Sequence, residues 1–265
     1  MKLFLAIIFI IPTLVVRAQG PPYGKPITDA AIITRYACVV LVKSTKECSG
    51  VMVGPRHVVT AAQCVTDGAK VAESKNTFVT SSDLQGRISS SSKTVSVTKI
   101  IVHDKYVGGS NYPAVLVQND LAFLRLSEAV DPFYKDSYFK VCPIAPNKPS
   151  DGTAMLMIGF QEVNQAKDKG LVEYATKVRS SDKCVEITDS AKKKGYTNTI
   201  CTVETQNTYC EDTVIGGGLF TKGSSSVGGI NIGTTLTGCN TGVTYFHLSL
   251  TGFSKQIQDF ISKYP

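Results

Sequence analysis

The chain contains three histidines, His57, His103 and His247, which are its only side chains that ordinarily exchange a proton near neutral pH. A general base needs such a group beside a nucleophile, and a zinc site needs several ligands at close spacing. Neither H-x-x-x-H nor H-E-x-x-H occurs. We therefore interpret the three histidines as surface or strand-packing residues, and we expect neither a metal nor a cofactor.

The cysteines indicate the compartment. There are eight of them, and no C-x-x-C occurs, which in an exported protein points to disulfides rather than to a metal site or a redox pair. Export is predicted because Met1-Lys2, an uncharged apolar stretch over Leu3–Val16 and the small residue Ala18 together are typical of a secretory signal. We expect a signal peptide over 1–18, a short N-terminal segment over 19–26 and a secreted, extracellular protein. The cysteine pattern alone leaves 105 connectivities open.

The composition describes a globular chain. Hydrophobic residues make up 43% and charged residues 18%, which is enough apolar material for a core and excludes a disordered or collagen-like chain. The 22 glycines and 11 prolines indicate many turns, so a helical bundle is not expected. The net charge of +7 falls to +5 once Lys2 and Arg17 are removed with the signal, which does not indicate a nucleic-acid partner. No segment after the signal is long enough to span a membrane.

Short runs of β-branched and aromatic residues, separated by turn residues, must supply the framework for any site. They predict an all-β sandwich or pair of barrels. Phe253, Ile257, Phe260 and Ile261 repeat at helical spacing and predict a final amphipathic helix. The predicted strands are Val39–Lys43, Gly50–Gly54, His57–Thr60, Thr94–His103, Leu121–Leu126, Ala154–Phe160, Val172–Arg179, Val227–Ile232 and Val243–Leu250.

Three segments carry a resemblance to a known family. They are Gly50-Val-Met-Val-Gly-Pro-Arg-His-Val-Val-Thr-Ala-Ala-Gln-Cys64, Asn119-Asp-Leu-Ala-Phe-Leu-Arg-Leu126 and Cys210-Glu-Asp-Thr-Val-Ile-Gly-Gly-Gly-Leu219. They resemble, in order, the blocks of chymotrypsin/trypsin-like serine proteases that hold the histidine, the aspartate and the serine of the catalytic triad. The resemblance implies an all-β fold of two perpendicular six-stranded barrels with a C-terminal helix. It places the first barrel in 27–139 and the second barrel and helix in 140–265.

The same resemblance implies that the triad is degenerate. Gln63 stands at the histidine position, Asp120 keeps the aspartate position, and Ile215 stands at the serine position when Gly216-Gly217 is aligned. Counting from Cys210 places Val214 there instead. Because an amide is not basic and an aliphatic side chain is not a nucleophile, we expect no catalytic residues and a pseudo-protease rather than an enzyme.

The substrate-binding residues and the disulfides follow from the same comparison. The resemblance places the former specificity pocket at Thr208, Asn231, Gly233 and Gly242, without the carboxylate that binds Lys or Arg. We further expect Val214 and Ile215 to turn inward and block the old cleft. The family pattern pairs Cys48 with Cys64, Cys184 with Cys201, and Cys210 with Cys239, which leaves Cys38 and Cys142 to pair with each other.

Three functions are compatible with such a chain. The first is an inactive protease homologue that binds proteins, as a decoy or inhibitor of a proteolytic or immune cascade such as complement. In its rewritten nucleophile loop the chain is similar to the inactivated protease paralogues of the scabies mite. The second is a cryptic hydrolase that uses Thr213 or another unusual nucleophile, and the third is a structural or storage protein of a secretion. A protein partner, no nucleic acid and no membrane are expected in the first case.

Overall fold

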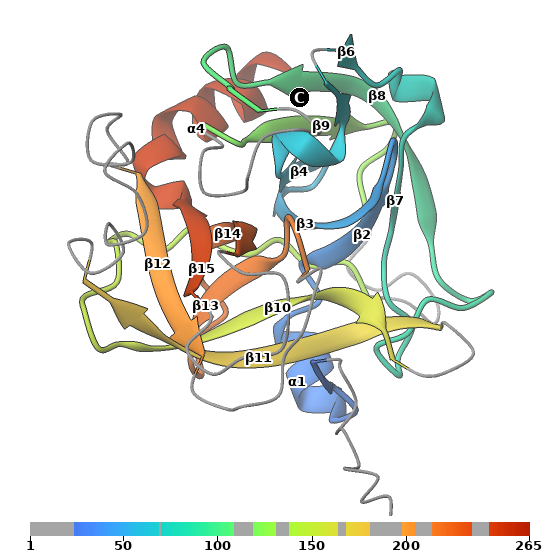
Figure 1. The fold of residues 1–265 in the computed structure, drawn as a ribbon. Coiled ribbons are helices and arrows are strands. Elements are labelled where there is room, and N and C mark those ends of the chain that lie inside the picture. The colour runs from blue at the N-terminus through green and yellow to red at the C-terminus, as the bar shows by residue number, and fades with distance from the viewer. Residues whose placement is uncertain are drawn as a thin grey trace, which may run out of the picture.

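The computed structural model describes residues 24–68, 70–108, 119–130, 138–163, 168–180, 198–204, 214–234 and 244–265. Its first half forms a closed antiparallel barrel (Figure 1), with strand order β2-β3-β4-β9-β8-β7. The barrel closes where β7 pairs with β2, with Thr80 opposite Leu41. The strands are β2 (Val39–Lys43), β3 (Glu47–Gly54), β4 (His57–Thr60), β7 (Phe78–Thr80), β8 (Thr94–Val102) and β9 (Ala122–Leu126).

The second half forms another antiparallel barrel, in the order β11-β10-β13-β14-β15-β12, which closes because β12 also pairs with β11. A short strand, β1 (Lys25–Pro26), adds to β11 from outside. The fold predicted from the sequence, two six-stranded barrels, is therefore confirmed. The strands are β10 (Ala154–Glu162), β11 (Lys169–Arg179), β12 (Thr199–Glu204), β13 (Gly218–Thr221), β14 (Val227–Thr234) and β15 (Thr244–Ser249).

Side-chain alternation separates the inside of the second barrel from its wall. Met155, Met157 and Tyr174 are buried in its interior cluster, whereas Leu156, which lies between the two methionines, is only partly buried. This is the period of two that strands impose. A larger buried cluster includes residues of both barrels, so one continuous core joins them.

Among the residues that the structure describes, two α-helices cover the barrels. α1 (Ala30–Arg35) was not predicted, and it begins at Asp29, whose carboxylate accepts the Ala31 backbone N–H at 2.8 Å. The predicted C-terminal helix is confirmed as α4 (Ser254–Lys263), which follows a 3-10 turn, η5 (Leu250–Phe253). Within the described ranges, the other short elements are η1 (Ala62–Cys64), β5 (Thr66–Asp67), β6 (Lys70–Val71) and η2 (Ser74–Asn76).

Helix α4 packs on the first barrel although it follows the second in sequence, and Figure 1 shows it beside β9. The Phe260 ring lies 5.1 Å from the Phe123 ring of β9. The carbonyl oxygen of Tyr264 accepts a hydrogen bond from Arg125 Nε at 3.2 Å and contacts His57 Nε2 at 2.8 Å. The Tyr264 carbonyl therefore connects the end of α4 to β4 and β9.

Two of the predicted disulfides are formed, Cys38–Cys142 and Cys48–Cys64. Cys201 is also disulfide-bonded, but Cys184, Cys210 and Cys239 lie outside the described residues, and their pairing stays a prediction. The predicted signal peptide over 1–18 lies outside them as well. Within the described part of the chain, no helix has both the length and the apolar character to cross a membrane.

Candidate functional site

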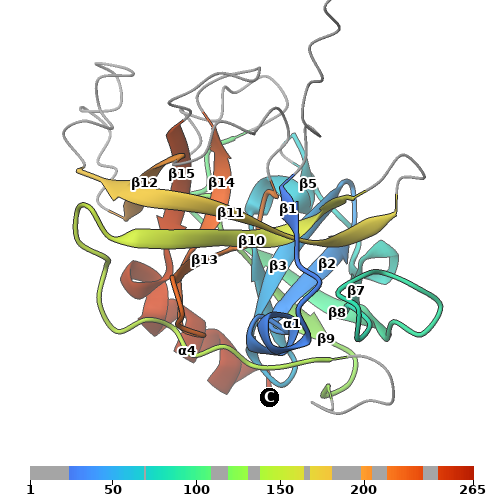
Figure 2. The ribbon, with the colours of Figure 1, turned by 90° about the horizontal axis from the view of Figure 1, so that it is seen from below.

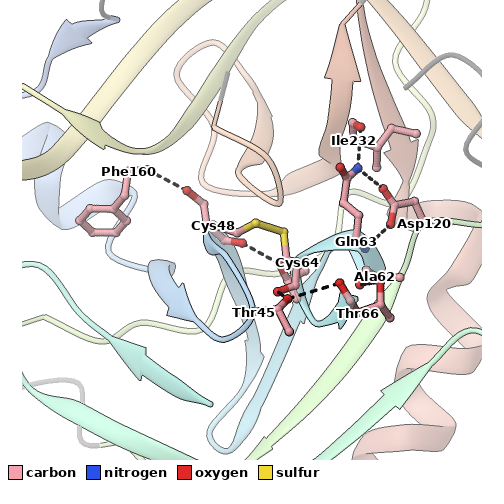
Figure 3. The surroundings of a disulfide bond; sticks show 11 residues. Thr45, Cys48, Ala62, Gln63, Cys64, Thr66, Asp120, Phe160 and Ile232 are labelled. Atoms are coloured by element: carbon pink, nitrogen blue, oxygen red, sulfur yellow. Dashed lines mark hydrogen bonds between the residues drawn. A yellow bond between two sulfur atoms is a disulfide. The ribbon is translucent and has the colours of Figure 1, made fainter. Parts of the chain in front are cut away.

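Gln63 lies on η1, directly after β4, at the end of the segment that carries the first motif. Three contacts fix this short turn. The Cys48–Cys64 disulfide ties it to β3, the Thr66 hydroxyl donates to the Ala62 carbonyl at 3.0 Å, and the Thr45 hydroxyl donates to the Cys64 carbonyl at 3.2 Å (Figure 3). The glutamine therefore extends from a backbone with little freedom to move.

The side chain of Gln63 connects the two barrels. Its Nε2 donates to Asp120 Oδ2 at 2.5 Å and to the carbonyl oxygen of Ile232, on β14, at 2.9 Å. Its backbone N–H donates to Asp120 Oδ1 at 2.9 Å. Figure 3 shows the amide between the carboxylate and the Ile232 carbonyl. The structure thus brings together Gln63 and Asp120, which the sequence motifs indicated. The third member of the cluster, the Ile232 carbonyl, was not indicated by any motif.

Asp120 is fully buried, at the end of a tight turn that leads into β9. Asn119 precedes it with a φ of 50°, a left-handed conformation that asparagine tolerates better than most residues. Burial raises the pKa of Asp120 to about 6, while hydrogen bonds from Gln63 and the Ala62 backbone act to lower it. Near pH 7 the carboxylate is therefore mostly ionised, and it is held by neutral N–H donors instead of an imidazole.

This arrangement cannot perform the proton transfers of a triad. A primary amide has two N–H donors and one acceptor, and both donors of Gln63 are engaged. The nitrogen carries no lone pair that would take a proton from a hydroxyl near neutral pH. Among the described residues, no group of three His, Cys, Asp or Glu side chains could hold a metal ion in its place. The pair has the chemistry of a structural hydrogen bond.

The turn at Val214–Gly217 lies against β3 and β14. The Ser49 backbone N–H donates to the Ile215 carbonyl at 2.8 Å, and the Gly216 N–H donates to the Asn231 carbonyl at 2.8 Å. The Ser49 hydroxyl accepts the Phe160 N–H at 2.8 Å. Ser49 therefore links the first barrel to the turn and to β10, a role that the motifs did not reveal.

The two aliphatic residues of the turn face different surroundings. Val214 is 3% exposed and belongs to the interior cluster of the second barrel. It lies so close to Gly159 that a Cβ there would come within 2.4 Å of the valine Cβ. Ile215 is only partly buried and packs against the core that the barrels share. The inward turn expected of both residues holds fully for Val214.

Two of the four residues predicted to form the former specificity pocket lie in the described part of the chain. Asn231 and Gly233 lie on β14 and are buried, and the Asn231 side-chain oxygen accepts the Gly233 N–H at 3.4 Å. Thr208, Gly242 and the alternative nucleophile Thr213 lie outside the described residues.

The histidines are placed as packing residues. His57 stacks edge-on against Phe260, and His103 does the same against Phe253. His247 is fully buried on β15 with its Nε2 2.9 Å from the Thr202 hydroxyl, and burial lowers its pKa to about 3. None of these contacts involves Gln63 or Asp120.

Asp120 should make the free energy of unfolding depend on pH. Because its pKa is raised in the folded state, its contribution to stability is greatest below pH 4 and is lost as the pH rises through 6. Relative to Asp120→Asn, the native chain should lose about 2 kcal/mol between pH 4 and pH 7, since one pKa unit corresponds to about 1.4 kcal/mol and the unfolded-state carboxyl is already partly ionised at pH 4. Urea unfolding at a series of pH values measures this.

The matched control for that experiment is Asp151→Asn, at an exposed position. It should leave the pH dependence of the native chain unchanged. If the difference between native protein and Asp120→Asn were the same at pH 4 and pH 7, the buried carboxylate would not titrate as described.

Comparisons with known proteins bear on the family and the fold. The chain matches the Trypsin family model over residues 27–257. It is similar in fold to neuropsin, a serine protease expressed in the limbic system of mouse brain, with a TM-score of 0.68 and 18% identity over 90% of this chain and 98% of that one. It is also similar to kallikrein-related peptidase 10 in complex with Zn²⁺, with a TM-score of 0.63 and 16% identity over 89% and 98%. No curated protein sequence matches it. The family match spans most of the chain, which therefore belongs to the trypsin family of serine protease folds.

Proposed function

We propose that this chain is a secreted, catalytically inactive member of the trypsin family that acts by binding another protein. The observation that carries the proposal is the hydrogen bonding of Gln63, whose amide donates to Asp120 and to the Ile232 carbonyl. A proton-accepting imidazole is missing from the place where a triad needs one. The aspartate that would orient it is satisfied by the amide instead.

The absence of a nucleophile supports the same proposal. Ile215 and Val214, the two candidates for the serine position, are both aliphatic. Triad residues act as a unit, so loss of the base and of the nucleophile together removes nearly all the rate that the triad provides. The fold nevertheless remains intact, with a buried core shared by both barrels. Such a scaffold can present loops to a partner without turnover.

The partner that we propose is a protein of a proteolytic or immune cascade, such as complement, which the chain would engage as a decoy or inhibitor. A domain of this fold can occupy the place of an active protease in an assembly without cleaving anything. We include in this proposal the similarity to inactivated protease paralogues of the scabies mite that the rewritten nucleophile loop suggests. Disulfides fit an oxidising, extracellular setting.

Inactivity predicts that a fluorophosphonate probe will not label the purified chain, because neither residue aligned with the serine position, Val214 or Ile215, carries a hydroxyl to form the covalent adduct. Gln63→His should also remain unlabelled and cleave no amide substrate, since the mutation restores the base alone. Intact mass spectrometry measures both results, with an active trypsin-family protease as the positive control. Stoichiometric labelling of either chain would contradict the proposal and favour a cryptic hydrolase.

The binding role needs its own measurement. Purified chain added to a reconstituted complement cascade should lower terminal product formation in proportion to its concentration. Heat-unfolded chain is the control. No effect on any cascade tested, together with no partner recovered from serum or haemolymph, would favour a structural or storage protein.

A further inference from the structure

A pocket of about 400 Å³ lies on the outer wall of the second barrel and is lined by residues of β1, α1, β10 and β11. Figure 2 shows β1 and α1 beside these two strands. Leu156 and Ala175 pair across those two strands and form its apolar floor. Ile32 of α1 contributes a further apolar wall. The pocket shares no residue with the Gln63 cluster, and its size falls within the usual range of small-molecule sites.

Tyr36, which follows α1, supplies a buried polar atom that lacks a partner. The residue is 1% exposed, and its ring packs on that of Phe220 with centroids 4.8 Å apart. Burial raises the pKa of its hydroxyl, whereas Arg35 and the Gly223 backbone N–H, which are both donors, lie close enough to act in the opposite direction. No described residue accepts a hydrogen bond from the O–H itself. A buried O–H without an acceptor is rare in folded proteins.

The charges around the pocket favour an anion. Its lining includes three cationic side chains, Lys25, Arg35 and Lys222, and one acidic residue, Glu173. Lys25 Nζ lies 3.0 Å from the Glu173 carboxylate, so these two charges largely neutralise each other. Neither Arg35 nor Lys222 forms an ion pair with a described residue. Two positive charges therefore remain beside a hydroxyl that can donate.

We propose that this pocket binds a small organic carboxylate, with its charged end near Tyr36, Arg35 and Lys222 and its apolar body on Leu156 and Ala175. Lys and Arg side chains have donors and no acceptor, and the Tyr36 O–H also lacks an acceptor. A carboxylate supplies acceptor oxygens and the opposite charge. An apolar body matches the three aliphatic residues of the lining, Ile32, Leu156 and Ala175. The site is independent of whether the chain cleaves peptides.

The probe for this proposal is 3-phenylpropionate, titrated into the purified chain by calorimetry and followed by thermal unfolding. The native chain should bind it and gain thermal stability, whereas the uncharged 3-phenylpropionamide and inorganic phosphate should bind at least about fivefold more weakly. Arg35→Gln, Lys222→Gln and Tyr36→Phe should each weaken binding of the carboxylate about fivefold or more. Lys70→Gln, an exposed lysine on β6, is the charge-matched control and should bind as the native chain does.

The ligand-free Tyr36→Phe variant separates binding from folding. It keeps the ring that packs on Phe220 and removes a hydroxyl without a partner, so its melting temperature should be no lower than that of the native chain. Loss of binding without loss of stability supports the site. Equal binding of the amide or phosphate, or unchanged carboxylate affinity in Arg35→Gln and Tyr36→Phe, would overturn it, and so would no binding by the native chain.

Discussion

Gly216→Ala is expected to cost about 3 to 5 kcal/mol of unfolding free energy, or to prevent folding, because the upper ranges of two penalties add at this position. Gly216 has a φ of 77°, where an L-residue is strained. A Cβ there would also lie 2.1 Å from the Ser49 carbonyl oxygen and 2.5 Å from the Thr60 hydroxyl. Neither atom can move easily, since the Thr60 hydroxyl donates to that same carbonyl at 2.7 Å. Urea unfolding measures the loss.

Gly223→Ala is the matched control for this prediction. Gly223 has a similar φ of 85°, but an added Cβ would have nothing within 4 Å. It should therefore show the backbone strain alone, roughly 1 to 2 kcal/mol. Equal losses in the two variants would mean that contact between the turn and Ser49 adds nothing to stability, and that the turn relaxes to accept a methyl group.

The second large loss of unfolding free energy is expected on removal of the Cys38–Cys142 disulfide, which spans 104 residues. Replacing both cysteines by alanine should lower the unfolding free energy by about 4 to 5 kcal/mol, because a long loop is released in the unfolded chain. The melting temperature should fall by about 10 °C or more for a domain of this size. Calorimetry on the double variant measures this directly.

The Cys48–Cys64 bridge provides the comparison, since it spans only 16 residues. Its removal should cost about 3 kcal/mol on the same reasoning. Both bridges are largely buried, so the alanine replacements create similar small voids. A larger loss from the shorter loop would show that the anchoring of Gln63 beside Cys64, rather than chain entropy, dominates.

The barrel strands could be read from the sequence because their signal is local. Each predicted strand segment overlaps an observed strand, and the period-two alternation at Met155–Met157 shows why. Three barrel strands, β7, β12 and β13, and helix α1 were not predicted. β13 is four residues long and follows a glycine run, which reads as a loop. Helix α1 has six residues, although Asp29 before Ala30-Ala31 was an available capping signal.

The candidate site could be predicted only in part. Gln63 and Asp120 each lie in a motif, so their proximity followed from the family resemblance. The bond from Gln63 to the Ile232 carbonyl joins residues 169 positions apart. Ile232 lies at a register shift in β14 between Asn231 and Gly233, which no local pattern encodes. The Tyr36 pocket could not be predicted either, because it forms only where α1 and β1 pack on the barrel wall.

The contacts of Tyr264 with Arg125 and His57 affect the order in which parts of the fold can form during synthesis. All six strands of the first barrel are synthesised before β10 begins, yet β4 and β9 receive their partners from residue 264. Phe123 of β9 contacts Phe260 of α4. During synthesis this contact can form only after the whole second barrel has been made, because α4 follows that barrel in the sequence. The first barrel is therefore synthesised first, but its packing is complete only when the C-terminal helix has formed.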